Sequence, residues 1–579
     1  MLDRLQSRFI VTAMGDWVGV LSRTAAVALL AASAVCASAE DQTSAPVAKP
    51  AAFSPVYVIR ADHWSPIDER DYASFIAELG ASGCATVNAC LHDAHNPFRA
   101  SDPAGVVFAS DCADLPYVLR FYFAWKRGLP FSYESEVEAR GHTNDIRYTF
   151  RGNSVAARTD VAGGEMSGYE ILDQLRDAVS SASYRIHPDL EEPYEPDQYS
   201  PAIKPGSIRP GTMIYDPNGH LATVWRVDSD GRIHYLDAHP DHSVTRGFYD
   251  LRFVRAYPGM GAGFKNWRPL RLVGATKEAD GTYTGGHIEL TPNSEIADFS
   301  DAQFYGNGAR PTDEAARTDS VFLLNNERLD YYDYVRAQMA GGTLAFDPLR
   351  EVGDMVDSNC ADLHYRVDAV VLAIQAALDK QPEPDRLPPN IYGTEGDWET
   401  FSTPSRDARL KTAFKELRDV AERFMGMAAR RDPKLNYHGH NLAADMLTVY
   451  DRHAAQCAVS YTRSDGSHIT FGYEVARARL FNMSFDPYQC IERRWGADSG
   501  EEFAPCADNT LKTAWYEAER NLRNQIDRTY EARMDFSLAE LRTPGPGKGA
   551  PAPPDIDVRS YLVSQSHPLL SQAQSPPRY

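Results

Sequence analysis

Three residues of this chain have the types and the order needed for thiol chemistry. Cys112 stands where a helix is predicted to begin, His220 follows a Pro-Asn-Gly turn at the start of a predicted strand, and Asp237 ends the next predicted strand. A thiol, a histidine on a rigid strand and a carboxylate beside it can serve as nucleophile, general acid/base and orienting group. The pattern therefore predicts a catalytic site made of Cys112, His220 and Asp237.

The position of the thiol relative to the predicted helix matters for its reactivity. A neutral thiol is a poor nucleophile, and a helix N-terminus and a nearby imidazolium both lower its pKa. If Asp111 caps the helix, Cys112 lies in the first turn, but Pro116 then leaves one carbonyl without a donor. If Asp114 is the cap, Cys112 lies just outside the helix and gains less from the dipole.

Three residues are candidates for orienting His220: His234, Asp237 and His239. Side chains alternate between the two faces of a strand, so Asp237 and His234 cannot serve together. Asp237 is favoured, because a carboxylate both orients an imidazole and stabilises its charged form.

A metal site formed by the histidines and aspartates between residues 234 and 242 is the alternative interpretation of this region. The cluster contains carboxylates and imidazoles, which suit zinc, but their spacing matches no helical H-E-x-x-H pattern. We therefore expect neither a metal nor another cofactor. The residues of this cluster are His234, Asp237, His239, Asp241 and His242.

At these residues the sequence resembles the papain-like superfamily, in two branches, over roughly residues 105–260. Asp111-Cys112 followed by Pro210-Gly211-Thr212-Met213 and Gly219-His220 is similar to NlpC-type cell-wall peptidases and amidases, whose third residue corresponds to His234 here. The spacing from His220 to Asp237 instead resembles transglutaminase-like proteins, in which an aspartate orients the histidine. The resemblance implies a cysteine hydrolase with a Cys-His-Asp site.

This chain also departs from the family pattern. Ala113-Asp114 stands where a small Ser or Gly pair is usual after the D-C motif, and Thr212 replaces the usual acidic residue. No convincing upstream glutamine is present for an oxyanion hole, and the stretch 130–205 implies an insertion.

The predicted elements indicate an α+β fold. Helices come first and the strands of an antiparallel sheet follow, with a hairpin turn at Asp228-Ser229-Asp230-Gly231. Hydrophobic periodicity predicts helices over 71–79, 113–127 and 168–180, and strands over 212–215, 221–227, 233–236 and 253–256.

The 579 residues are too many for one small domain and predict several segments. They are a signal peptide (1–39), a linker (40–56), the papain-like α+β domain (57–275), a connecting segment (276–319), a mostly α-helical domain (320–542) and a Pro-rich disordered tail (543–579). Helices in the second half are expected over 363–378, 410–425, 441–450 and 511–538.

The N-terminus has the layout of a secretory signal. Arg23 precedes an apolar run that ends in Ala37-Ser38-Ala39, an A-x-A pattern that predicts cleavage near Ala39. The run is too short for a stable bilayer anchor, and no other stretch has the length of apolar residues that a membrane helix needs. We therefore expect a periplasmic or secreted protein without a membrane span in the mature chain.

Seven cysteines follow the predicted cleavage site, an odd number that leaves one thiol unpaired in an oxidising compartment. Close spacing favours the disulfides Cys84–Cys90 and Cys490–Cys506. Cys360–Cys457 would then join two helices, which leaves Cys112 free. Sequence spacing makes this connectivity a preference among several.

Charge and motif together limit the function. A formal charge of −21 repels phosphate backbones and no basic stripe offsets it, so nucleic acid is not an expected partner. Two functions remain. One is a secreted thiol hydrolase or acyltransferase that acts on an amide bond of peptidoglycan or an envelope peptide. The other is a catalytically inactive papain-like protein with a binding or scaffolding role in the cell envelope.

Overall fold

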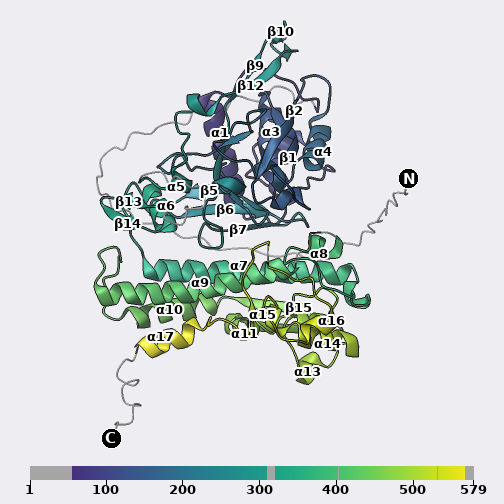
Figure 1. Cartoon of the computed structure of the whole chain (residues 1–579), viewed down its shortest axis with the longest axis vertical. Coiled ribbons are helices and arrows are strands. Elements are labelled where there is room, and N and C mark those ends of the chain that lie inside the picture. The colour runs from purple at the N-terminus through teal and green to yellow at the C-terminus, as the bar shows by residue number, and fades with distance from the viewer. Residues whose placement is uncertain (1–54, 309–319, 395, 402, 531, 567–579) are drawn as a thin grey trace, which may run out of the picture. The chain divides into compact units, whose positions relative to one another are not determined.

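The structure, a computed structural model, describes residues 55–308, 320–394, 396–401, 403–530 and 532–566 (Figure 1). All of them belong to one compact unit that spans residues 53–579. The predicted signal peptide, its cleavage site and almost all of the predicted linker lie outside the described residues.

A six-stranded antiparallel sheet is the centre of the first half of the chain. Its strand order is β3-β8-β4-β5-β6-β7. Its strands are β3 (Gln198–Tyr199), β4 (Met213–Asp216), β5 (His220–Val227), β6 (Ile233–Ala238), β7 (Val244–Phe248) and β8 (Gly263–Trp267). Together with the helices around it, this sheet makes the fold α+β, as the sequence predicts.

Three of the four predicted strands belong to this sheet, and the fourth is wrong. Residues 253–256 form no strand, because the Asp250 carboxylate and carbonyl accept the N–H groups of Arg252 at 2.9 Å and Phe253 at 3.1 Å and turn the chain. The strands β7 and β8 lie on either side of this turn and were not predicted. Their short, mixed-polarity sequences carry little period-two alternation.

One face of the sheet packs against helices of the N-terminal half. These are α1 (Pro66–Ala81) and α3 (Leu115–Arg127), and α4 (Gly168–Ala178) packs against α3. Ser65 and Asp68 form a capping box at the start of α1, and Gly128 ends α3 in the left-handed conformation with φ 68°. Sheet residues such as Met213 and Leu236 are buried in this core.

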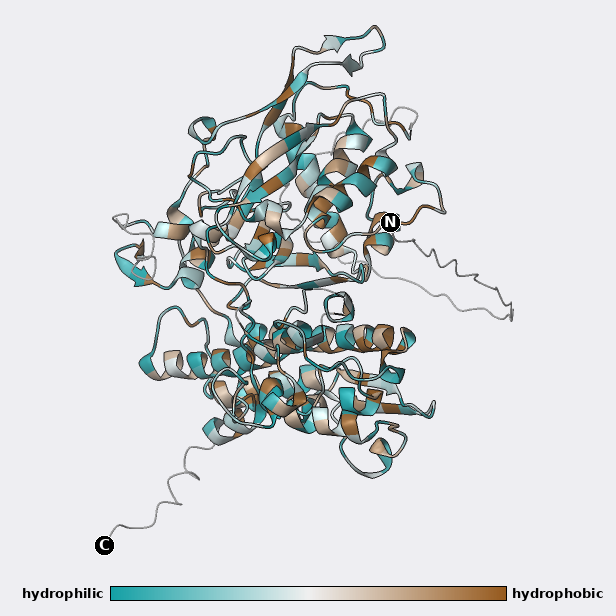
Figure 2. Ribbon diagram, turned by 45° about the vertical axis from the view of Figure 1, so that its right-hand side comes forward, coloured by the Kyte–Doolittle hydropathy of each residue, from teal (hydrophilic) through white to brown (hydrophobic). Residues whose placement is uncertain are grey.

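The other face of the sheet packs against the helices of the second half. The principal ones are α6 (Tyr331–Met339), α7 (Pro348–Gln375) and α9 (Thr403–Arg430), and α10 (Leu442–Ala454) packs against α7 and α9. Val224 and Tyr235 of the sheet share one core with Val356 of α7 and Leu417 of α9. Apolar residues recur along these long helices among polar ones (Figure 2). Part of the helical half therefore shares a core with the sheet, whereas a separate buried cluster that includes Trp398, Phe485 and Trp515 is formed by the second half alone.

The C-terminal elements differ from the predictions in two places. The predicted helix 511–538 is replaced by α14 (Thr510–Ala518), α15 (Arg520–Asn524) and an irregular segment. Residues 543–579 were predicted to be a disordered tail, yet Val558–Ser566 forms helix α17. Leu562 is fully buried in the core of the helical half, and Arg418 of α9 lies 3.7 Å over the ring of Tyr561. Residues 567–579 lie outside the described residues.

The remaining elements are shorter or lie at the edges. They are α2 (Val87–His92), β1 (Ser132–Ala139), β2 (Asn153–Asp160), β9 (Leu270–Val273), β10 (Thr276–Lys277), β11 (Tyr283–Thr284), β12 (His287–Leu290), α5 (Ala302–Tyr305), β13 (Phe322–Leu324), β14 (Glu327–Leu329), α8 (Gly396–Phe401), β15 (Ala458–Thr462), β16 (His468–Gly472), α11 (Tyr473–Arg479), α12 (Ile491–Arg494), α13 (Gly500–Phe503) and α16 (Leu538–Leu541).

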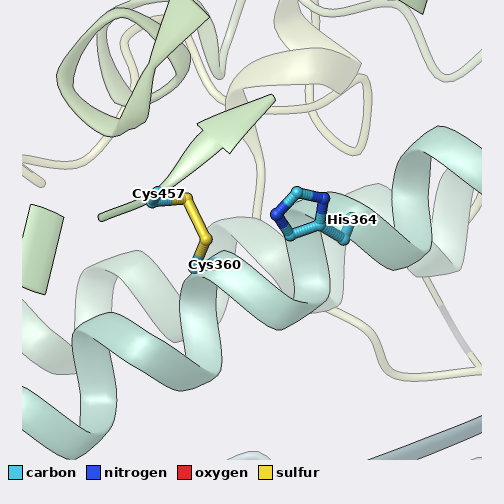
Figure 3. A group of neighbouring side chains, drawn as sticks. All are labelled: Cys360, His364 and Cys457. Carbon is cyan, nitrogen blue, oxygen red and sulfur yellow. A yellow bond between two sulfur atoms is a disulfide. The ribbon is translucent and has the colours of Figure 1, made fainter. Parts of the chain in front are cut away.

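Three disulfides join the cysteines as the spacing predicts. They are Cys84–Cys90, Cys360–Cys457 and Cys490–Cys506, and Cys112 is the free cysteine among the described residues. Figure 3 shows Cys360 on α7 bonded to Cys457, which precedes β15. Disulfides are typical of secreted and periplasmic proteins. Within the ranges given above, no helix has the length and apolar character needed to cross a membrane.

Candidate active site

His220 and Asp237 face each other on neighbouring antiparallel strands. The turn before His220 is closed by Asp216, whose carboxylate and carbonyl accept the N–H groups of Asn218 and Gly219 at 2.9 and 3.0 Å. Gly219 has φ 90°, and a Cβ there would come within 3.0 Å of the Tyr148 hydroxyl. This turn fixes His220 as the first residue of β5.

Asp237 lies on the face of β6 that points toward the helices of the second half. His220 Nε2 donates a hydrogen bond to Asp237 Oδ2 at 2.6 Å, and Thr245 on β7 donates its hydroxyl proton to Oδ1. The side chain of Asp237 is fully buried, whereas 19% of the His220 side chain is exposed. The carboxylate thus holds the imidazole from inside the protein while the ring keeps limited access to solvent.

A third partner of Asp237 comes from α9. Arg409 Nη1 lies 2.8 Å from the same oxygen that His220 contacts and 3.1 Å from His220 Nε2. Burial alone would raise the pKa of Asp237, but Arg409 and the His220 hydrogen bond outweigh it and hold that pKa well below 3.8. Asp237 is therefore a carboxylate shared between a histidine and an arginine.

Cys112 lies in the turn before α3 and does not open the helix. Pro116 occupies the first turn, where its missing N–H costs little, and α3 starts at Leu115. The Asp111 carboxylate accepts the N–H groups of Ala113 at 2.7 Å and Asp114 at 3.2 Å. These two donors, which could otherwise bind an oxyanion, are thus engaged within the turn.

The sulfur of Cys112 reaches the start of β5. Its thiol lies 3.8 Å from the carbonyl oxygen of Gly219, and the N–H of Leu221 donates toward the same sulfur. These two backbone groups flank His220 in the sequence. The sulfur of Cys112 therefore lies against the backbone on either side of His220, whose ring is bonded to Asp237.

The surroundings favour a neutral thiol at Cys112. Burial is the largest effect that raises its pKa above 9.0, and the carboxyl groups of Asp111, Asp114 and Asp237 add to it. Burial and a hydrogen bond with Asp111 also raise the pKa of Asp114, to about 9. A preformed thiolate next to these groups is disfavoured, because removing the thiol proton would add negative charge to a carboxyl-rich turn.

The two other candidates for the orienting residue lie elsewhere. His234 is on the opposite face of β6, as alternation requires, and bonds Asp228 at 2.9 Å. His239 is beside the site: its Nε2 donates to the Thr245 hydroxyl at 3.0 Å, and its ring stacks on Tyr365 of α7. Burial lowers the pKa of His239 to about 3, so it is a neutral neighbour that steadies Thr245.

The histidine and aspartate cluster considered for a metal does not converge on a point. His234 faces away from Asp237, Asp241 bonds Ser243 and pairs with Arg406 at 3.4 Å, and His242 contacts the carbonyl of Ser110. Two other groups of side chains have metal-ligand types: Cys360, His364, Cys457 (Figure 3) and Cys490, Glu492, Cys506. Zinc binds cysteine as the free thiolate, and in both groups the cysteines are paired in disulfides. These cysteines therefore cannot serve as zinc ligands while the disulfides are intact.

Sequence reasoning missed two residues that contact Asp237. Thr245 lies directly opposite Asp237 in the β6–β7 register, so a prediction of β7 would have located it. Arg409 belongs to a helix of the second half, and nothing in the local sequence connects it to this site. The packing of α9 against the sheet is what brings Arg409 to Asp237.

Comparison of the chain with family models, with curated proteins and with solved structures finds no match. The assignment of function therefore depends on the geometry of the site.

Proposed function

We propose that this protein is a periplasmic or secreted thiol hydrolase or acyltransferase that acts on an amide bond, with Cys112 as nucleophile, His220 as general acid/base and Asp237 as the orienting carboxylate. One observation carries the proposal. The free cysteine places its sulfur against the two backbone groups that flank His220, and His220 is hydrogen-bonded to a buried carboxylate. Peptidoglycan or another envelope peptide is the substrate class that the papain-like resemblance implies.

The surroundings of the thiol favour general-base activation over a preformed ion pair. His220 donates from Nε2 to Asp237, so Nδ1 is the ring nitrogen left to accept the thiol proton. As sulfur attacks the carbonyl carbon, that proton moves to His220, and Asp237 stabilises the imidazolium. His220 then protonates the leaving amine as the C–N bond breaks. Water or an acceptor amine resolves the thioester.

A binding role without catalysis is the second candidate function, and two observations favour it. Arg409 occupies the same carboxylate oxygen as His220, which weakens the ability of Asp237 to stabilise an imidazolium. Tyr530 stacks on Tyr148 at 3.8 Å and donates its N–H to Asn218 in the turn before His220, so the second half of the chain also covers this edge.

Alkylation of the non-reduced protein with iodoacetamide, followed by peptide mass mapping, distinguishes the two functions. We expect Cys112 to be the labelled site, with a rate that rises through pH 9 because burial and nearby carboxyl groups raise its pKa. If His220 accepts the thiol proton, His220→Ala should slow labelling at pH 7 by about 10²-fold. A thiol that reacts only after denaturation, or equally fast in both proteins, would support the binding role.

A further inference from the structure

A cavity lies on the face of the sheet opposite α1 and α3, between strands β6 and β7 and helices α6, α7 and α9. Its volume is about 390 Å³, within the range of small-molecule sites. Helices α7 and α9 belong to the layer that faces β7 in Figure 1, and α6 lies beside β13. The cavity is separate from the space beside His239, which holds about 30 Å³.

Aromatic rings form much of the cavity wall. Phe248 and Tyr249 come from the end of β7 and the loop after it, Phe346 precedes α7, and Phe424 lies on α9. Such rings enclose the apolar part of a ligand and also attract an organic cation through their π faces.

The polar groups of the wall distinguish between ligand charges. Six carboxyl groups line the cavity (Asp250, Asp333, Glu351, Asp354, Glu416 and Asp419), against four guanidinium groups (Arg232, Arg252, Arg336 and Arg423). The arginines are engaged by acids: Arg336 pairs with Glu351 at 2.7 Å and Arg232 with Asp354 at 2.6 Å. Carboxyl groups thus take up most of the positive charge of the wall, although Arg232 Nη2 has no hydrogen-bond partner.

One carboxyl group keeps an unused oxygen. Glu416 of α9 is 6% exposed, and its Oε1 is buried without a hydrogen-bond partner. The other oxygen faces Arg252 at 3.5 Å. Ser358 of α7 also lines the cavity, and its hydroxyl is buried and likewise has no partner. A buried acceptor without a donor is costly, so a ligand that donates a hydrogen bond here would be stabilised.

We propose that this cavity binds a small organic amine with an apolar body, its ammonium group bonded to Glu416 Oε1 and its apolar part enclosed by the aromatic wall. The state of Glu416 in the protein agrees with this assignment. Burial and the neighbouring Asp250 raise the pKa of Glu416 well above its ordinary value, and Arg252 opposes that effect only in part. An ammonium group beside Glu416 would stabilise the ionised carboxylate, which Arg252 stabilises only in part.

The test is calorimetric titration of the purified protein with 2-phenylethylamine and with its uncharged analogue 2-phenylethanol. We expect the amine to bind at least about 10-fold more tightly, because a hydrogen bond between charged groups is stronger than one to a neutral group. Glu416→Gln should remove this preference. Glu422→Gln, a matched change at an exposed position of the same helix, should leave it intact.

A cavity-filling variant keeps the test decisive if Glu416→Gln does not fold. Ser358→Leu places a larger apolar side chain in the cavity without removing a buried charge, and should abolish binding of both compounds. The proposal is overturned if the wild-type protein binds neither compound or does not distinguish them, or if Glu416→Gln folds and still prefers the amine. None of these results depends on activity at Cys112.

Discussion

Replacing Cys112 with alanine is expected to lower the rate of amide cleavage by about 10⁴-fold, because the sulfur forms the covalent bond to the acyl group. Purified peptidoglycan and its stem peptides are suitable substrates, with release of free amine as the measurement. The thiol makes only weak contacts, with the backbone groups of Gly219 and Leu221, so its removal should leave the fold and the free energy of unfolding nearly unchanged.

The matched control for this variant is Cys112→Ser, which keeps a hydroxyl of similar size in the turn. A hydroxyl is far less acidic than a thiol, so this variant should be nearly as inactive as Cys112→Ala. Cleavage that persists in both proteins at the wild-type rate would contradict the assignment of Cys112 as nucleophile. Wild-type protein that cleaves no peptide while Cys112 remains inert would favour the binding role.

Local sequence patterns sufficed for the parts of the site that neighbouring strands supply. The hairpin turn and the alternation along β6 placed Asp237 on the face of His220, and His234 on the other face, without knowledge of the rest of the fold. The disulfides were predictable for a similar reason. Two of them close short loops, and the third, Cys360–Cys457, was a preference among the three pairings that the remaining cysteines allow.

The parts that were missed depend on contacts between segments distant in sequence. The position of Arg409 follows from the packing of α9 on the sheet, and the sharing of one core between the two halves leaves no local signal. Helix α17 was missed because its proline-rich flanks dominate the composition, whereas Leu562 and Tyr561 pack against the helical half. The start of α3 was ambiguous because two aspartates could cap it, and the proline in its first turn decided the outcome.

The exchange Asp237→Asn is expected to affect both stability and catalysis. It removes the charge that pairs with Arg409, whose side chain is 16% exposed, and an uncompensated buried charge costs about 3 to 5 kcal/mol in the free energy of unfolding. It also removes the group that stabilises the His220 imidazolium, so cleavage should fall by about 10⁴-fold. Urea unfolding and amine release measure the two effects.

The stability effect has a defined pH dependence. The pKa of Asp237 is held well below 3.8 in the folded protein, so its contribution is complete above that value and is lost as the pH falls through the folded pKa. The difference in unfolding free energy between the wild-type protein and Asp237→Asn should therefore be constant above about pH 5 and should shrink in more acidic solution. A difference that grows as the pH falls would contradict the assigned pairing.

The double variant Asp237→Asn/Arg409→Gln separates the structural role of Asp237 from its role at His220. Removing both members of a buried ion pair leaves no unpaired charge, so most of the lost stability should return. Catalysis should not return, because the imidazolium formed at His220 still lacks a carboxylate to stabilise it. If the double variant regains both stability and activity, the role of Asp237 is structural only, as the ion-pair partner of Arg409.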